Sequence, residues 1–397
     1  MKGKGSELLN QHTEATIVYG EALLFSSLHQ LAIHDYGKAI LNLKESYTLF
    51  KDFEKQIEGV EDKIDPELYI LLKFDLGMFM FFLSVLSEVL GPTTRKLMAV
   101  IGLKGDQEKG LQYLNEVINS NSIRSGLAYS ILSTKFLLLG EVQFIPGRQS
   151  EIEKGMELIL VASSKYPQSL SFSLLHGIVL RMQGNHLDAA AHFEETASRL
   201  SSKNFDPSAA RINVAHCYMN LGEWDRAIQI YQEVESSNNY TYPYTATLFR
   251  GLNLIMKGNE DEGHEAIQVA LKTGKDDSEF KYIAERYNGN GFFGFFEYLY
   301  IHGDFKYTPE KAEEFLGILN DISNKLGINA ESRGDTPTTK KYKHSKKHKE
   351  SHVIILNAVK AKLLKLQNRY DEALPHYNRL LGLKPSGKVE KNIYWER

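Results

Sequence analysis

Residues 211–234 read RINVAHCYMNLGEWDRAIQIYQEV and carry the pattern of two short antiparallel helices joined by a tight turn. Small residues at Ala215 and Ala227 fall where the two helices must approach closely, and Gly222 supplies the positive φ of the turn. Tyr218 and Tyr231 fill the space beside this contact. One such hairpin cannot bury its own apolar face, so the sequence predicts further hairpins beside it.

The same spacing recurs in three other stretches. Gly184 takes the turn position upstream, Gly258 takes it downstream, and Asn368 takes it in a last copy, where Asn tolerates the left-handed conformation better than most residues. Together the copies define a repeat signature: Gly177, Gly184, Ala189, Phe193, Ala215, Tyr218, Gly222, Ala227, Tyr231, Gly251, Gly258, Ala373 and Tyr377. Four copies in register predict an all-α superhelix, a solenoid of stacked helical hairpins.

Weaker copies precede the regular ones. Residues 7–54 read as a helical pair, and GLKGDQEKGLQYLNEV, residues 102–117, keeps the second half of the pattern. Between them, Leu68–Leu90 is the most apolar run of the chain, but Lys73 and Asp75 leave its uncharged part shorter than the roughly 20 residues that span a bilayer. We expect a buried core helix, and a segment that dips into a lipid surface is the open alternative.

Three parts of the chain are expected to differ in order. Residues 1–330 are predicted to form the helical array, and residues 351–397 a C-terminal helical hairpin that completes the same array. Between them, residues 331–350 are rich in Lys, His, Thr and Pro and offer no apolar face to bury. This segment is therefore expected to be a basic, disordered loop.

Charge and cysteine content limit the classes of partner and compartment. The chain has 47 basic and 50 acidic residues, a formal net charge of -3, so no general attraction to nucleic acid or an anionic membrane is expected. The single cysteine, Cys217, cannot form an intramolecular disulfide, and the first residues lack the apolar core of a secretory signal. We expect a cytoplasmic protein without a transmembrane span; a peripheral place on lipid droplets and a nuclear location stay open.

Three patterns suggest chemistry at first sight, and none predicts a cofactor. Gly289, Gly291 and Gly294 have the GxGxxG spacing of a dinucleotide site, but the preceding KYIAERY reads as helix where a strand is required. We expect the start of an aromatic helix there. His344 and His348 have the spacing of paired metal ligands, yet the lysines around them oppose a cation, so no metal is expected.

Catalysis is not predicted either. His216 and Cys217 are neighbours, and adjacent side chains on a helix point away from each other, so they cannot form a base and nucleophile pair. Cys217 is expected to pack in the core. No catalytic residues are assigned, and the protein is predicted not to be an enzyme.

Four strings occur in the same order as in a known family: GPTTRKLMAVIGLKGDQEKGLQYLNEV, GNHLDAAAHFEE, CYMNLGEWDRAIQIYQEV and YTATLFRGLNLIMKG. Over residues 15–385 the chain resembles the tetratricopeptide repeat protein 39 family, which includes the fungal inclusion-body-clearance protein. The resemblance implies a tetratricopeptide-like solenoid without known catalytic residues, and roles in lipid and sterol homeostasis or in the clearance of aggregates at lipid droplets. No functional residue of the family has a motif sharp enough to be carried over.

The expected functional surface is a groove along the first helix of each regular hairpin. Its predicted residues are Leu174, Ile178, Arg181, Ile212, His216, Met219, Leu248, Leu252 and Ile255. Nearly all are apolar, unlike the Lys and Asn of arrays that clamp a chaperone tail, so we expect the groove to hold a partner's helix or peptide. An interior or surface that binds a sterol-like ligand or a lipid droplet is the alternative. An apolar patch of this size should be covered, by a partner or by a segment such as Leu68–Leu90.

Overall fold

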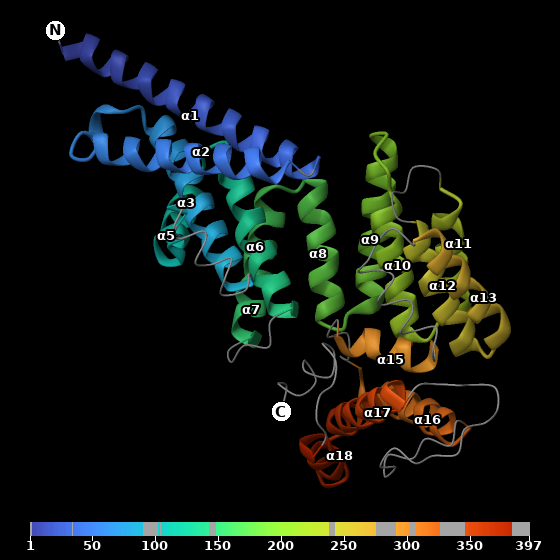
Figure 1. Cartoon of the computed structure of the whole chain (residues 1–397). Coiled ribbons are helices and arrows are strands. Elements are labelled where there is room, and N and C mark those ends of the chain that lie inside the picture. The colour runs from blue at the N-terminus through green and yellow to red at the C-terminus, as the bar shows by residue number, and fades with distance from the viewer. Residues whose placement is uncertain are drawn as a thin grey trace. The chain divides into compact units, whose positions relative to one another are not determined.

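A computed structural model gives the fold, and it is helical throughout the part of the chain that it describes. The described residues are 2–33, 35–89, 102–103, 105–142, 148–237, 243–274, 291–301, 307–325 and 346–382. Figure 1 shows many of these helices paired with a neighbour in the chain as antiparallel hairpins. The predicted all-α, tetratricopeptide-like solenoid class is confirmed.

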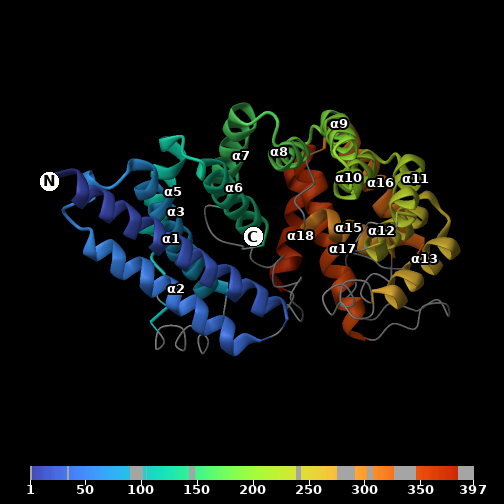
Figure 2. The ribbon, with the colours of Figure 1, turned by 90° about the horizontal axis from the view of Figure 1, so that it is seen from above.

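The chain divides into two compact units, and unit 1 comprises residues 1–137 and 153–162. Its elements are α1 (Lys2–Ala32), α2 (Tyr36–Gln56), η1 (Glu61–Lys63), α3 (Pro66–Val89) and α5 (Gln107–Ser120), with most of α6 (Ser125–Val142) and the middle of α7 (Arg148–Lys165). Helices α1 and α2 lie side by side (Figure 2). Asp35 and Asp106 cap the starts of α2 and α5, because each side chain accepts a backbone N–H of the first turn.

Helix α3 lies at the centre of unit 1. Leu72, Leu76, Phe79 and Leu83 are buried there, and they pack with Phe50 of α2 in one apolar cluster. The interpretation of this apolar run as a core helix is therefore confirmed. Within the described residues, no helix combines the length and apolarity needed to cross a bilayer.

Unit 2 comprises residues 138–152 and 163–397. Its helices are α8 (Leu170–Met182), α9 (His186–Ser202), α10 (Ser208–Leu221), α11 (Trp224–Glu235), α12 (Pro243–Lys257), α13 (Glu260–Thr273), α15 (Gly291–Ile301), α16 (Pro309–Lys325), α17 (Lys346–Leu366) and α18 (Tyr370–Gly382). Helices α8–α13 form three consecutive hairpins, and α17 and α18 form another. These are the four stretches in which the repeat signature occurs.

The hairpins of unit 2 use the signature residues at their turns and crossings. Gly184, Gly222, Gly258 and Asn368 all have positive φ at the turns. At the crossing of α8 and α9, Phe193 is fully buried against Gly177. A Cβ at Gly177 would clash with the ring of Phe193. The remaining signature residues at the crossings are likewise enclosed: Ala189, Ala215, Ala227, Tyr231 and Ala373 are buried, Gly251 touches the backbone of α13, and Tyr218 and Tyr377 pack at the cluster edge.

The predicted boundaries near the C-terminus can be compared with the helices. Helix α17 begins at Lys346, inside the segment 331–350 that we expected to be a loop, and the rest of that segment lies outside the described residues. The hairpin expected within 351–397 consists of α17 and α18, and residues 383–397 are outside the described part.

Candidate partner-binding groove

The nine predicted groove residues lie on α8, α10 and α12, the first helices of three hairpins. Six of them lie on α10 and α12, and all six are buried: Ile212, His216, Met219, Leu248, Leu252 and Ile255. On α8, Arg181 is buried, whereas Leu174 and Ile178 are half-buried at the edge of the same apolar cluster. The predicted groove residues are therefore enclosed on α10 and α12 and partly accessible on α8.

Helix α15 packs on two of the predicted groove residues, His216 of α10 and Ile255 of α12. Tyr298 stacks on His216 with 5.4 Å between ring centroids, and its ring meets Phe249 edge-on at 4.6 Å. At the start of α15, Gly291 lies against Ile255 so closely that a Cβ would clash with it. An aromatic helix from the same chain thus occupies the surface that the sequence assigned to a ligand.

His216 is the polar centre of this contact. Its Nδ1 lies 2.8 Å from the hydroxyl of Tyr231, and its Nε2 lies 3.4 Å from the hydroxyl of Tyr298. A neutral imidazole has one donor and one acceptor nitrogen, and each hydroxyl can take either role, so both pairs can be satisfied in the buried site. The residue therefore acts as a hydrogen-bonded core histidine between α11 and α15.

A second polar contact fixes the chain just after α15. The hydroxyl of Tyr307 donates to Oδ1 of Asn220, 3.0 Å away, and the Asn220 amide donates to the backbone carbonyl of His216. All three residues are buried. Since a buried amide without partners is costly, this pairing stabilises the packing of Tyr307 against α10.

Other residues of α15 pack on α11, α16 and α17. Phe293 stacks on His352 of α17 at 4.7 Å, and Phe295 contacts Trp224 of α11 and Phe315 of α16 at 5.4 and 6.3 Å. Helix α15 is thus enclosed on several sides, which explains why its sequence is aromatic all round.

Sequence reasoning chose the wrong segment to fill the groove. The described part of this run, residues 68–89, lies in α3 (Pro66–Val89), whose buried apolar residues pack in the core of unit 1. The segment that does cover it is α15, whose sequence GFFGFFEYLYI has no polar face. Apart from Glu297, this helix is apolar or aromatic, and that pattern is the sequence signal for a helix buried on several sides.

The glycine motif, the single cysteine and the paired histidines can also be compared with the structure. Gly291 and Gly294 lie in α15, which confirms an aromatic helix there, and Gly289 lies outside the described residues. Cys217 is fully buried in the core, as expected. His344, and the side chain of His348, are not described. In the described ranges, no three His, Cys, Asp or Glu side chains are grouped as metal ligands.

The family model of Iml2/Tetratricopeptide repeat protein 39 matches residues 1–276, well over half of the chain. The chain belongs to this family. A relative in Caenorhabditis elegans, tetratricopeptide repeat protein ttc-39B, is 25% identical over 203 residues, which are 48% of this chain and 34% of the relative. The match thus spans about a third of that relative's length.

Solved structures with similar helices include yeast Tom70, with a TM-score of 0.44 and 14% identity over 95% of this chain and 62% of the other. A tetratricopeptide repeat protein from Parabacteroides merdae has a TM-score of 0.33 and 17% identity over 67% of this chain and 97% of the other. For this member of the Iml2/tetratricopeptide repeat protein 39 family, the fold assignment rests on its own helical hairpins. Arrays of this kind present extended concave surfaces for binding.

Proposed function

We propose that the chain is a non-enzymatic adaptor that binds an apolar helix or peptide of a partner protein along α8, at the open end of the groove. The observation that carries this proposal is the covering of the adjoining α10 and α12 surface by α15. A surface that accepts an aromatic helix of its own chain has the chemistry to accept a similar helix of a partner.

The accessible part of this site is small and apolar. Leu174 and Ile178 on α8 are half-buried, and α15 forms the neighbouring part of the cluster. Burial of a large aliphatic side chain is worth about 1.5–3 kcal/mol, so two such contacts support a weak, exchangeable complex rather than a permanent one. A partner helix with Leu or Phe at helical spacing would cover Leu174 and Ile178, which α15 leaves partly accessible.

Photo-crosslinking in cells tests this proposal in the full-length chain. A photoreactive residue at Ile178 should capture a specific protein, whereas the same residue at Leu187 should not, because Leu187 is 65% exposed on the outer helix α9. The captured protein, once purified, should bind the wild-type chain and lose about tenfold or more in affinity for Ile178→Asp. Equal binding to Ile178→Asp and to Leu187→Asp would refute the site.

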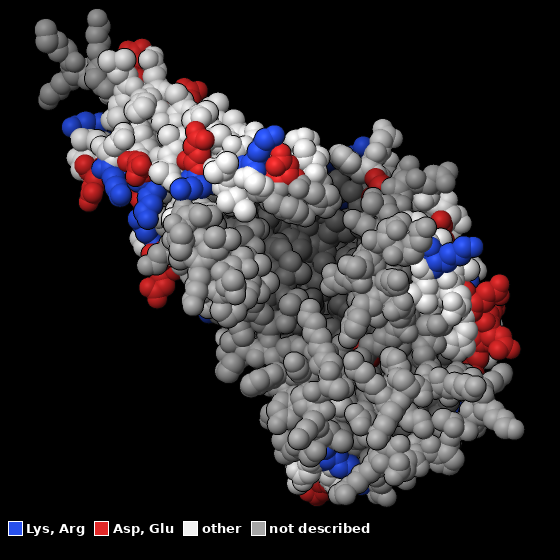
Figure 3. Space-filling view, viewed as in Figure 1, with Lys and Arg blue, Asp and Glu red and all other residues white. Residues whose placement is uncertain are grey.

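A second candidate function is contact with a lipid surface, and the exposed face of α1 favours it. Leu8, Val18 and Phe25 are 67%, 61% and 63% exposed, and they share one face with the exposed Ala15 and Ala22. Uncharged side chains form much of the visible surface of α1 (Figure 3). Exposed apolar side chains on one face of a helix can enter the boundary of a lipid surface.

Flotation with vesicles of phosphatidylcholine tests this second function. The wild-type chain should float with the vesicles, and Val18→Glu combined with Phe25→Glu should abolish flotation without changing the fold. Leu187→Glu is the matched control, since it adds a charge at a similarly exposed position of unit 2. Failure of the wild-type chain to float would exclude α1 as a lipid-binding helix.

A further inference from the structure

A pocket lies in unit 1 among α2, α3, α5 and the turn that contains η1. It has a volume of about 350 Å³, at the lower end of the range of small-molecule sites. Its lining includes Lys51, Lys55, Lys73 and Lys109, with Tyr69 and Tyr113. The groove of unit 2 contributes nothing to this pocket, and neither proposed function uses it.

Two of these lysines are held against the walls of the pocket. The ammonium of Lys73 lies 4.6 Å from the ring centroid of Tyr69 and 5.6 Å from that of Tyr113, and it pairs with Glu116. The ammonium of Lys109 lies 3.0 Å from the Glu54 carboxylate. Since ion pairs and cation–π contacts already fix these cations, the walls are ordered before a ligand arrives.

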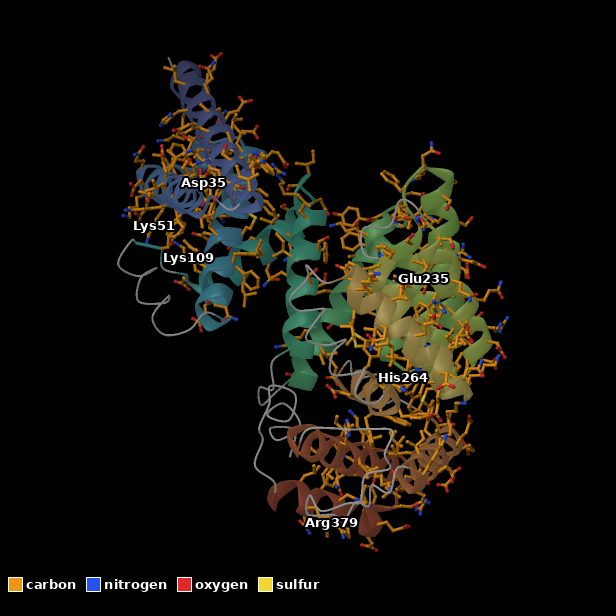
Figure 4. The ribbon with its side chains drawn as sticks, turned by 45° about the vertical axis from the view of Figure 1, so that its right-hand side comes forward. Asp35, Lys51, Lys109, Glu235, His264 and Arg379 are labelled. Atoms are coloured by element: carbon orange, nitrogen blue, oxygen red, sulfur yellow. The ribbon has the colours of Figure 1, made fainter. Side chains whose placement is uncertain are left out.

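Lys51 differs from the other lysines of the lining. Lys55 pairs with Asp52 at 3.7 Å, and Lys73 and Lys109 pair with glutamates, whereas no ion pair of Lys51 occurs within the described ranges. Its ammonium lies 5.6 Å from the ring centroid of Tyr47, and it lines the same pocket as Lys109 (both are labelled in Figure 4). An ammonium without a neutralising carboxylate favours an anion in the pocket.

The lining also contains three acidic groups, Glu54, Glu58 and Glu61. Glu54 accepts from Lys109 and from the hydroxyl of Tyr113. Backbone N–H groups of Glu61 itself and of Gly59 lower the pKa of the Glu61 carboxyl, and Lys73 adds to the effect. Glu58 is exposed to solvent. The lining therefore contains four lysines and three glutamates, and Lys51 is the lysine among them for which the described residues show no ion pair.

The base of the pocket is apolar. Ile57, Leu72 and Leu76 line it, and each is 2% exposed or less. A ligand with an anionic group at the lysines can therefore place a short organic group against this base, where it loses little hydration.

We propose that this pocket binds a small phosphate monoester, whose phosphate contacts Lys51 and Lys109. A carboxylate would bring no more charge than Glu54, which it would have to displace from Lys109. A phosphate carries nearly two negative charges at pH 7 and three acceptor oxygens, so it can outcompete the glutamate. Lysine ammonium groups suit this anion because they act as compact point charges.

Isothermal titration calorimetry on the full-length chain tests the proposal with hexyl phosphate, inorganic phosphate and hexanoate. Hexyl phosphate should bind with a Kd of about 1 mM or tighter, and hexanoate about tenfold more weakly. Equal binding of both phosphates would identify free phosphate as the ligand, and tighter binding of hexyl phosphate would identify an organic ester. Absence of binding by either phosphate, or hexanoate binding as tight as hexyl phosphate, would overturn the proposal.

Substitutions locate the binding site. Lys51→Ala should weaken hexyl phosphate binding by about tenfold, and Lys51→Arg should retain it. Lys38→Ala is the matched control, because Lys38 also lies on α2 but pairs with Asp35 and does not line the pocket. Thermal melting should show that all three variants are folded. Unchanged binding to Lys51→Ala, or equal weakening by Lys38→Ala, would rule out this pocket as the site.

Discussion

The ring of Tyr298 stacks on the imidazole of His216, although the two residues lie far apart in the sequence. Tyr298 comes from α15 and His216 from α10, so this contact joins the aromatic helix to the inner face of the repeat hairpins. The hydroxyl of Tyr298 adds a long polar contact of 3.4 Å to Nε2. Most of the contact is therefore ring packing, so removal of the ring should lower the free energy of unfolding mainly through the loss of buried apolar area.

Substitutions at Tyr298 separate these two contributions. Tyr298→Phe should cost less than about 1 kcal/mol, because it keeps the ring and loses the long hydrogen bond to His216. Tyr298→Ala should cost about 3 kcal/mol or more, because it leaves a cavity beside His216 and Phe249. Urea unfolding measures both free energies, and similar losses in the two variants would contradict the assignment of the contact to ring packing.

Leu252→Asp tests whether α15 closes the groove. Leu252 is fully buried on α12, so an aspartate there would be desolvated without a partner. We expect a loss of about 4 kcal/mol or more, seen as unfolding of unit 2 by circular dichroism. Leu187→Asp should leave the fold intact because Leu187 is 65% exposed. A folded Leu252→Asp variant would mean that α15 leaves the groove readily.

Ala227→Trp tests the close helix crossing of the central hairpin. Ala227 is fully buried between α10 and α11, so a large ring must push the helices apart at a cost of about 1–3 kcal/mol or more. Ala209→Trp is the matched control on the same hairpin, because Ala209 is exposed. Thermal melting should separate the two, and equal melting temperatures would argue against a tight crossing.

Two glycines should respond to alanine in opposite directions. Gly222 has a φ of +75°, a conformation that costs an L-residue about 1 kcal/mol, so Gly222→Ala should destabilise the protein. Gly317 lies inside α16 with open space where a Cβ would be, so Gly317→Ala should stabilise it by about 0.5–1 kcal/mol. Stabilisation by Gly222→Ala would contradict the left-handed turn.

His376 should make stability depend on pH. Burial, with Lys360 and Arg379 nearby, lowers the pKa of His376 to about 4, and its Nδ1 lies 2.8 Å from Oδ1 of Asn357. The unfolded chain takes up this proton near pH 6.5 and the folded chain only near pH 4. The contribution is therefore complete above pH 6.5 and is lost as pH falls towards 4.

The size of the His376 effect should be modest because the side chain is partly exposed. We expect about 1–2 kcal/mol between pH 6.5 and 4, measured by urea unfolding at several pH values. His376→Gln cannot titrate, so its stability should vary less over this range. An identical pH dependence in both proteins would exclude His376 as the cause.

The sequence by itself determined the hairpins and their turns. Gly184, Gly222 and Gly258 mark the turns, and Ala215 with Ala227 marks a crossing, because these features depend on residues close together in the chain. Local φ preference and helical periodicity are encoded locally, so spacing alone revealed them. The apolar character of the predicted groove residues also follows from their identity and helical spacing in the sequence.

Only the tertiary structure decided what covers the groove and where a pocket forms. Both α3 and α15 are apolar enough to cover it, and the choice depends on how many long-range contacts each can make. Likewise, Lys51 and Lys109 come from separate helices and share no motif, yet folding brings them to one pocket. Packing between distant segments is a property of the whole chain, so no local pattern of residues reports it.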